Sequence, residues 1–509
     1  MNSAVKGYVH RTWAGTFKCK PERFLQPSTL DEIRQIVLQA RQKNKTVMLT
    51  GSGHSPSHMT MTDQWLVNLD RFNKVVKVNR HKSGKFTDVT VEAGMRVYQL
   101  NKFLASEGLS IQSLGSISDQ SMAGVISTGT HGSSAYHGLV SQQIVDLSIM
   151  TGSGEVIKCS TTEHSDMFRA GMLSLGKLGI ITEVTIRAVP VYTLETVFEV
   201  VPFDRFMNEL WDTVWLSQEY VRVWWFPYAR QVVLCRGQKS QKPADENTSS
   251  YFENPIRRFL YQAALLFAVK VMPSVTPLIE RLAFKLQYGY KDTYDKTEPV
   301  VFECVRGHNM DCLFSQFVNE WAMPLTEGKR VLRELEQVID KAAETGEFYA
   351  HSPFEVRIAN TTGTGKPVDL DNIPEFGAIP GNELKPLLDP TPKLPYASGE
   401  GKVTYDSITL YLNATMYRPF GIDCPVDKWY QKFESIVGPA GGKPHWAKNF
   451  LGSQGSSTKD GQMRGLQGVI KQWYGDDLDV WKKIRKQNDP TGIFLPPNND
   501  WAKINGLVD

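Results

Sequence analysis

The sequence has few of the residues that mark a disulfide-stabilised, zinc-binding or nucleic-acid-binding protein. Its six cysteines lie far apart and form no C-x-x-C pair, which favours reduced intracellular thiols over a disulfide framework or a zinc site. The formal net charge is only +3 over 509 residues, with no basic run and no acidic tail, so nucleic acid is not an expected partner. Residues 1–20 contain no apolar segment of the signal-peptide type, and we expect no metal site.

Long hydrophobic runs are also scarce, and the strongest one is short. Residues 259–275 are mostly apolar, follow Arg257 and Arg258, and are interrupted by Lys270 and Pro273. A membrane-spanning helix needs about 20 apolar residues. Two interpretations of this segment remain open, a buried helix and a helix on a membrane surface with basic flanks.

The length predicts two or more domains. Thr29, with Glu32 three positions later, is a capping pattern that predicts a helix over roughly residues 30–40. Strand-like runs and one further helix then alternate, which predicts an α/β or α+β nucleotide-binding domain. These runs are residues 47–49, 65–69, 75–78 and 89–91, and the helix is 98–107.

We place the domain boundary after a strand at residues 179–186, giving domains over residues 20–191 and 192–509. Residues 147–157 have the pattern of a β-hairpin around Gly-Ser-Gly. In the second domain, we expect residues 236–250 to be a polar, flexible excursion. Residues 361–402, rich in glycine and proline, are expected to be a long irregular insertion.

The most informative segment is the loop at residues 50–57, which is dominated by glycine and serine. Glycines allow positive φ and close backbone approach, so this loop is suited to present N–H groups to a diphosphate. It lacks the third glycine of a Rossmann fingerprint. Taken alone, it is either a flavin-diphosphate loop, with His54 able to bond covalently to the isoalloxazine ring, or an ordinary turn with an exposed histidine.

A second tract of small residues spans 114–132. It suits backbone lying along an extended cofactor or, equally, a loop over a sheet edge. Together with the first loop, and at this distance from it, the tract resembles the FAD domain of the vanillyl-alcohol oxidase superfamily. Residues 443–448 (KPHWAK) and 488–494 (NDPTGIF) resemble the C-terminal signature of the aldonolactone oxidases within it, as do residues 13–17 and 317–322.

The resemblance covers nearly the whole chain and implies an α+β architecture. It implies a two-subdomain FAD-binding domain, a cap domain with a large antiparallel sheet, and a C-terminal segment that returns to the flavin. It further implies that His54 is bonded covalently to the 8α carbon of FAD, and that Gly115 admits oxygen to the flavin. The other implied cofactor contacts are Gly51, Ser52, Gly53, Ser55, Ser116, Ser121, Gly124, Ser127, Ile181 and His445.

Three charged residues are candidates for the substrate site. Glu355 and Arg357 are two positions apart, so on a strand both side chains lie on one face; Lys448 lies in the KPHWAK segment. Without the resemblance, a surface ion pair and a solvated lysine would be the ordinary interpretation. The resemblance implies that Arg357 stabilises the reduced flavin. It implies that Glu355 orients Arg357 and accepts a hydrogen bond from a substrate hydroxyl, and that Lys448 contacts the oxygen at C2. Either Glu355 or Lys448 takes the hydroxyl proton. Gly115 and Ser116 complete the set.

The implied activity is oxidation of a sugar 1,4-lactone at C2 by oxygen, yielding an ascorbate-type ene-diol and hydrogen peroxide. There are three alternatives. One is a lactone dehydrogenase that reduces cytochrome c, an activity that Gly115 disfavours. The others are an alditol oxidase and a non-enzymatic flavin-binding or membrane-scaffold protein. Arabinono-, gulono- and galactonolactone are not separated by the sequence, and the oligomeric state is open. The resemblance also implies a mitochondrial membrane location. His10, His81, His164 and His308 are expected to be surface residues.

Overall fold

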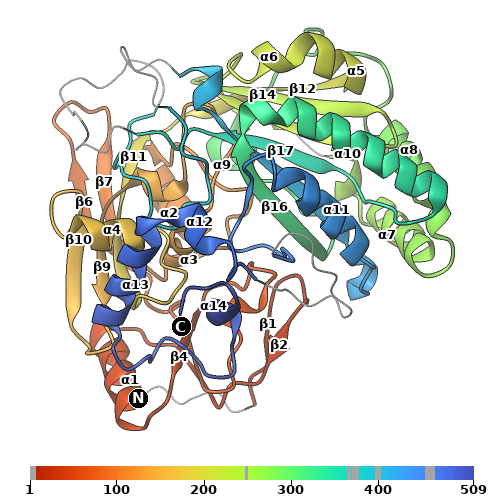
Figure 1. The fold of residues 1–509 in the computed structure, drawn as a ribbon. Coiled ribbons are helices and arrows are strands. Elements are labelled where there is room, and N and C mark those ends of the chain that lie inside the picture. Colours follow the sequence, from red (N-terminus) through yellow and green to blue (C-terminus); the bar gives the residue numbers. More distant parts are fainter. Residues whose placement is uncertain are drawn as a thin grey trace.

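The computed structural model describes residues 7–246, 250–363, 368, 378–395, 403–452 and 465–508. The chain forms two halves, as Figure 1 shows: residues up to about 190 lie at the lower left together with the last helices of the chain, and the large sheet with the helices between them lies at the upper right. Both helices and sheets are present in each half. The predicted α+β class with a large antiparallel sheet is confirmed.

The first half begins with a small parallel sheet. A short hairpin of β1 (His10–Arg11) and β2 (Lys18–Cys19) precedes it. The sheet has the strand order β3 (Arg23–Leu25), β5 (Trp65–Asn68), β4 (Val47–Thr50). Helix α1 (Leu30–Gln42) packs on it through Ile33, Val37 and Ala40. The predicted cap is present, because the Thr29 side chain accepts a hydrogen bond from Glu32 N.

A second, antiparallel sheet completes the first half. Its strand order is β10 (Val156–Ser160), β9 (Ile144–Met150), β11 (Ile180–Pro190), β7 (Thr87–Glu92), β6 (Val75–Arg80), with β8 (Leu109–Ser110) beside β11. Helices α2 (Val97–Ser106), α3 (Met122–Ser127) and α4 (Ser165–Gly171) accompany it. The predicted hairpin is confirmed, since Val156 pairs with Met150. The two sheets therefore form two subdomains.

The second half is built on an eight-stranded sheet whose strands all pair antiparallel. The order is β15 (Val300–Glu303), β12 (Thr193–Pro202), β14 (Gln231–Ser240), β13 (Tyr220–Phe226), β17 (Phe354–Ala359), β18 (Thr409–Tyr417), β16 (Gln316–Pro324), β19 (Lys443–Pro444). The expectation of a flexible excursion from residue 236 was wrong. Residues 236–240 extend β14, because they pair with 193–197 of β12.

The two faces of this sheet differ in chemistry. Alternate residues such as Val223, Val356 and Leu412 form an apolar core with helices α10 (Leu325–Thr345) and α11 (Asp427–Val437). The short helices α5 (Phe203–Arg205) and α6 (Trp211–Val214) lie on the same core. The intervening residues of the same strands point the other way. That second face carries the charged residues described below.

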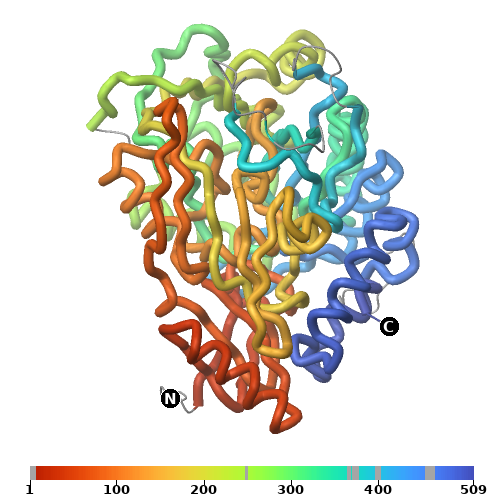
Figure 2. The backbone as a smooth tube through the Cα atoms, turned by 90° about the vertical axis from the view of Figure 1, so that its left-hand side faces the viewer, coloured from red at the N-terminus to blue at the C-terminus, as the bar shows by residue number. Residues whose placement is uncertain are grey.

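The C-terminal segment leaves the second half and packs on the first. Helices α12 (Ile470–Tyr474), α13 (Asp476–Asn488) and α14 (Trp501–Ile504) contribute Trp481 and Trp501 to the core that contains Val89 and Leu147. An ion pair of 3.0 Å between Arg169 Nη2 and Asp477 Oδ1 joins α4 to α13. Figure 2 shows this segment, in dark blue, along the edge of the first half.

Helices α7 (Pro255–Lys270) and α8 (Thr276–Gln287) form an exposed hairpin at the edge of the second half (Figure 1). The short helix α9 (Cys304–His308) follows β15. Of the α7 side chains, only Leu265 and Ala268 are buried, while Phe259 is 58% exposed and Leu260 is 61% exposed. The interpretation of this segment as a buried helix was therefore wrong. Among the described residues, no helix is long and apolar enough to cross a bilayer.

Candidate active site

A cleft of about 900 Å³, including its open mouth, lies in the first half beside the carboxyl end of β4. Both tracts of small residues contribute to its walls, although they lie far apart in the sequence. The predicted cofactor residues in its lining are Gly51, Ser52, Gly53, His54, Ser55, Ser121, Gly124, Ser127 and Ile181.

The glycines of the first loop are required by close approach. A Cβ on Gly51 would lie 2.7 Å from Ser121 Oγ, so the two tracts are in contact there. Gly53 has φ +75°, and a Cβ on it would lie 3.1 Å from the Arg11 carbonyl oxygen. Asn68 Nδ2 donates to the Thr50 and Gly51 carbonyls at 3.3 and 3.2 Å. The loop is thus held with bare backbone against the cleft.

His54 lies in the lining of this cleft with an unpaired ring nitrogen. Its ring stacks on Trp13, at 5.4 Å between centroids, and Trp13 N donates to the Gly53 carbonyl at 2.7 Å. Nδ1 is buried and has no hydrogen-bond partner among the described residues. Burial lowers the pKa of His54 to about 4, with Arg96 and Lys448 acting in the same direction. The imidazole is therefore neutral at neutral pH, and one of its two ring nitrogens carries a lone pair.

The charged face of the large sheet lies beyond the cleft. Glu355 pairs across the strands with Asn413, and Asn413 pairs with Glu320, so the two carboxylates share one rung of the sheet. Arg357 and Arg222 are opposite one another on the next rung of this face. This confirms that β17 directs Glu355 and Arg357 to one side. Both are 5% exposed, so they are not a surface pair.

Glu320 is the residue that sequence reasoning missed. It is 0% exposed, and its Oε1 lies 2.5 Å from Arg357 Nη2 while its Oε2 lies 3.4 Å from Lys448 Nζ. Burial alone would raise the pKa of Glu320, but the positive charges of Arg357 and Lys448 hold it well below its usual value. In the sequence, the sign of Glu320 is an acidic residue inside the mostly apolar segment 317–322, a segment from which only the family resemblance was inferred.

Glu355 makes looser contacts than expected for the residue that orients Arg357. Its Oε2 is 3.4 Å from Arg357 Nε, and its Oε1 is 3.4 Å from Arg222 Nε. Neither contact has hydrogen-bond geometry, since Glu355 Oε1 and Arg357 Nε are buried without a hydrogen-bond partner. The short contact of Arg357 is with Glu320 instead. Arg222, on β13, is a further charged residue that the sequence did not single out.

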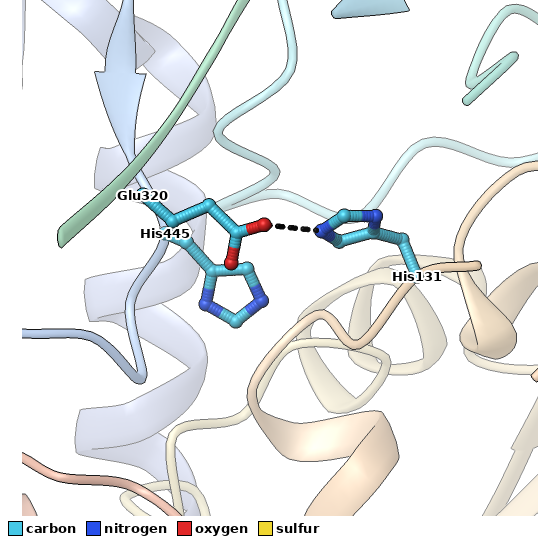
Figure 3. A group of neighbouring side chains, drawn as sticks. All are labelled: His131, Glu320 and His445. Atoms are coloured by element: carbon cyan, nitrogen blue, oxygen red, sulfur yellow. Dashed lines mark ion pairs between the residues drawn. The ribbon is translucent and has the colours of Figure 1, made fainter. Parts of the chain in front are cut away.

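Two buried histidines flank Glu320, as Figure 3 shows. His131 stacks on Tyr411 at 3.5 Å, and its Nδ1 donates to the Gly132 carbonyl, which leaves Nε2 as an acceptor. The backbone N–H of His445 donates to the Glu320 carbonyl at 2.8 Å. Burial lowers the pKa of both imidazoles, that of His445 to about 3. Both rings are therefore uncharged at neutral pH.

The possible ligand atoms of His131, Glu320 and His445 lie within 4.8 Å of one another, a spacing that a metal ion can use. The charge balance points elsewhere, because Arg357 and Lys448 already neutralise the single carboxylate. A divalent cation would have to compete with two fixed positive charges at the same oxygen atoms. We interpret the group as part of an ion-pair network.

Hydrogen bonds join the charged face to the two segments that contribute the walls of the cleft. Arg357 Nη1 donates to Ser116 Oγ at 3.4 Å, and Met310 N donates to the Ser116 carbonyl at 2.9 Å. Asn449, next to Lys448, donates from Nδ2 to the Pro56 carbonyl in the His54 loop at 3.0 Å. The predicted residues outside the cleft lining therefore gather at this junction. They are Gly115, Ser116, Glu355, Arg357, His445 and Lys448.

Two histidines expected on the surface are buried. His10 Nε2 is 3.2 Å from Thr60 Oγ1, and His308 Nε2 is 3.2 Å from the Tyr192 hydroxyl. Both rings lie where segments distant in sequence meet. Sequence spacing could not reveal those contacts.

Comparison with known proteins agrees with this geometry. A family model of FAD-binding domains matches residues 21–160, and a model of D-arabinono-1,4-lactone oxidases matches residues 184–505. The D-arabinono-1,4-lactone oxidase of Yarrowia lipolytica is 51% identical over 99% of each chain. That of Saccharomyces cerevisiae is 45% identical over 99% of this chain and 98% of the relative.

Solved structures show the same fold at low sequence identity. A cholesterol oxidase from B. sterolicum has a TM-score of 0.79 at 13% identity and covers 99% of this chain and 97% of its own. A solvent-stable cholesterol oxidase has a TM-score of 0.76 at 15% identity, covering 99% and 100%. The cleft fits FAD, since the glycines in its lining leave room for close backbone contact. The chain belongs to the D-arabinono-1,4-lactone oxidases, a family of FAD-dependent oxidoreductases.

Proposed function

We propose that the protein oxidises D-arabinono-1,4-lactone at its C2 alcohol, with oxygen as acceptor, to D-erythroascorbate and hydrogen peroxide. The observation that carries the proposal is the junction of a cofactor cleft with a buried charged cluster, in a chain 51% identical to a lactone oxidase. The substrate is taken from the names of the relatives.

In this proposal FAD lies in the cleft. Gly51, Ser52, Gly53 and Ser55 bind the diphosphate through their backbone, and His54 Nδ1 holds the isoalloxazine covalently through its 8α carbon. Bound FAD supplies a hydride acceptor for the alcohol and an electron donor for oxygen. Further contacts come from Ser116, Ser121, Gly124, Ser127, Ile181 and His445.

The charged cluster binds and orients the lactone. Burial opposes ionisation of Arg357, but Glu320 and Glu355 keep its pKa above the ordinary value, so it is a permanent cation. A fixed guanidinium favours negative charge that develops next to it. Glu355 Oε1, buried without a hydrogen bond, accepts a substrate hydroxyl. Lys448 contacts the oxygen at C2, and the hydroxyl proton passes to Glu355 or Lys448.

A panel of substrates tests the function. The kcat/KM measured by oxygen consumption and peroxide formation should be highest with D-arabinono-1,4-lactone and lower with L-gulono- and L-galactono-1,4-lactone. Xylitol tests for alditol oxidase activity. Cytochrome c, offered as electron acceptor in the absence of oxygen, tests for lactone dehydrogenase activity. Turnover of the alditol above all lactones, or reduction of cytochrome c without oxygen consumption, would overturn the proposal.

Gly115 is proposed to keep open the path of oxygen. A Cβ there would lie 2.6 Å from Thr130 Cγ2, so Gly115→Ala alone would displace that side chain. The double variant Gly115→Ala/Thr130→Ser removes the clashing methyl and isolates the effect on oxygen. We expect its flavin to be reoxidised by oxygen about tenfold more slowly, or about 1.4 kcal/mol of barrier, with reduction by lactone little changed.

Stopped-flow measurement of the two half-reactions decides this prediction. Thr130→Ser is the matched control and should keep both rates. Equal slowing of both half-reactions in the double variant would count against a role for Gly115 in oxygen access.

The exposed hairpin of α7 and α8 is proposed to rest on a membrane surface. Phe259, Leu260 and Leu278 project large apolar area into solvent, and Arg257 and Lys270 add positive charge suited to anionic lipid. The choice of a mitochondrial membrane rests on the family resemblance alone.

Vesicle flotation tests this attachment. With phosphatidylcholine vesicles containing an anionic phospholipid, Phe259→Glu/Leu260→Glu should lower the bound fraction by about tenfold or more, because each buried apolar side chain contributes about 1.5–3 kcal/mol. Val76→Glu, which changes an exposed valine of β6, is the matched control. Equal flotation of the double variant and the parent protein would refute the proposal.

A further inference from the structure

We propose that the two buried carboxylates of the cluster have separate tasks and that Glu320 is the positioning residue for Arg357 and Lys448. Glu355 then keeps its free oxygen for the substrate. This inference rests on the proposed function, since it assigns roles within the same site. It also corrects the expectation that Glu355 orients Arg357.

Glu320 lies between two cations, Arg357 and Lys448. Its side chain is 0% exposed, and each carboxylate oxygen faces a different cation. Oε1 accepts from Arg357 Nη2 at 2.5 Å, and Oε2 lies 3.4 Å from Lys448 Nζ. Its own backbone is fixed in β16, whose carbonyl at this residue accepts from His445 N. One anion therefore ties β17 to the segment that carries Lys448.

Glu355 is placed differently. Its two cation contacts are both at 3.4 Å and neither is a hydrogen bond, whereas Glu320 Oε1 accepts a hydrogen bond from Arg357. Glu355 Oε1 and Glu320 Oε2 are both buried without a hydrogen-bond partner among the described residues. A buried charged oxygen without a donor is costly to leave unsatisfied. A hydroxyl group of the substrate is the donor that Glu355 Oε1 lacks.

The charges predict how the two carboxylates differ in experiment. Arg222, Arg357 and Lys448 give three positive charges, and Glu320 and Glu355 give two negative charges, so the cluster carries +1. Glu320→Gln makes it +2, which should shift the midpoint potential of the bound flavin to a more positive value, because extra positive charge stabilises the reduced anion. The same change releases Arg357 and Lys448 from their common partner, and misplacement of such groups costs about 10²-fold in rate.

The decisive test compares Glu320→Gln with Glu355→Gln, which each remove one charge at constant shape. For Glu320→Gln we expect the midpoint potential to rise, the limiting rate of flavin reduction to fall about 10²-fold, and the Kd of the lactone to change by less than about threefold. A stronger oxidant that is reduced more slowly is a combination that simple destabilisation does not produce. For Glu355→Gln we expect the lactone Kd to rise about tenfold or more, as for loss of a hydrogen bond to a charged group.

Glu320→Asp keeps the charge and shortens the side chain, so it separates charge from geometry and serves if Glu320→Gln does not fold. Its midpoint potential should stay near that of the parent, while flavin reduction still slows; FAD content and thermal unfolding show that the fold is intact. An unchanged reduction rate in Glu320→Gln and Glu320→Asp, with Glu355→Gln still weakening lactone binding, would overturn this inference alone. Unchanged rate and Kd in all three variants would instead overturn the proposed substrate site.

Discussion

Replacing Arg357 by alanine should lower the limiting rate of flavin reduction by lactone by about 10²–10³-fold, while FAD stays attached. The reason is electrostatic. Arg357 is a buried permanent cation at the junction of cleft and cluster, and the loss of one preorganised donor aimed at developing charge costs about that factor. Anaerobic stopped-flow with the lactone measures the rate directly, and the flavin absorbance of the purified variant reports cofactor content.

A matched variant separates this effect from loss of stability. Arg236→Ala removes an arginine of the same sheet that pairs with the buried Glu199 at 2.8 Å, outside the site. Both variants leave a carboxylate without its partner, so both should unfold at lower temperature. Only Arg357→Ala should slow reduction. If Arg357→Ala reduces flavin near the parent rate, the Glu355 and Arg357 pair is not the substrate site.

Replacing His54 by alanine should abolish covalent attachment of the flavin while leaving weaker, reversible binding. His54 offers a neutral imidazole with a buried, unpaired Nδ1 in the cleft lining, and alanine offers no nucleophile. The remaining lining is largely backbone and small side chains, which do not depend on His54. Acid-denatured protein on a gel should show flavin fluorescence for the parent and none for the variant.

His58→Ala is the matched control for this result. His58 begins the short 3₁₀ helix η1 (His58–Thr60) after the same loop, and its Nε2 lies 3.2 Å from Asp500 Oδ1. Its removal should leave the fluorescent band in place. A fluorescent band that persists in His54→Ala would show that another residue carries the flavin, or that the band is unwashed cofactor.

Local elements followed from the sequence because their causes are local. Thr29 and Glu32 lie one turn apart, so the capping pattern determines where α1 begins whatever the rest of the fold does. Glu355 and Arg357 share a face because side chains alternate along any strand. The small residues around Gly51 and Ser121 were likewise visible, since close approach of two backbones excludes side chains.

Other expectations failed because the deciding contact was distant in sequence. The polar residues 236–240 became strand when β12 supplied a partner. His10 and His308 became buried where separate segments meet. Residues 259–275 had the composition of a buried or a membrane-surface helix, and only the packing of α7, which buries Leu265 and Ala268 alone, decided that its apolar face is exposed.

By itself, the sequence determined the glycine-rich cleft, the histidine within it, the helix caps and strands, and the family. The tertiary structure alone decided that Glu320 contacts both Arg357 and Lys448, and that Arg357 donates its short hydrogen bond to Glu320 and not to Glu355. The physical reason is that a strand pattern determines the face on which a side chain lies but not its partner. The register of β16, β17 and β18, together with the return of the C-terminal segment, brings an acid and two cations from three separate segments to one point.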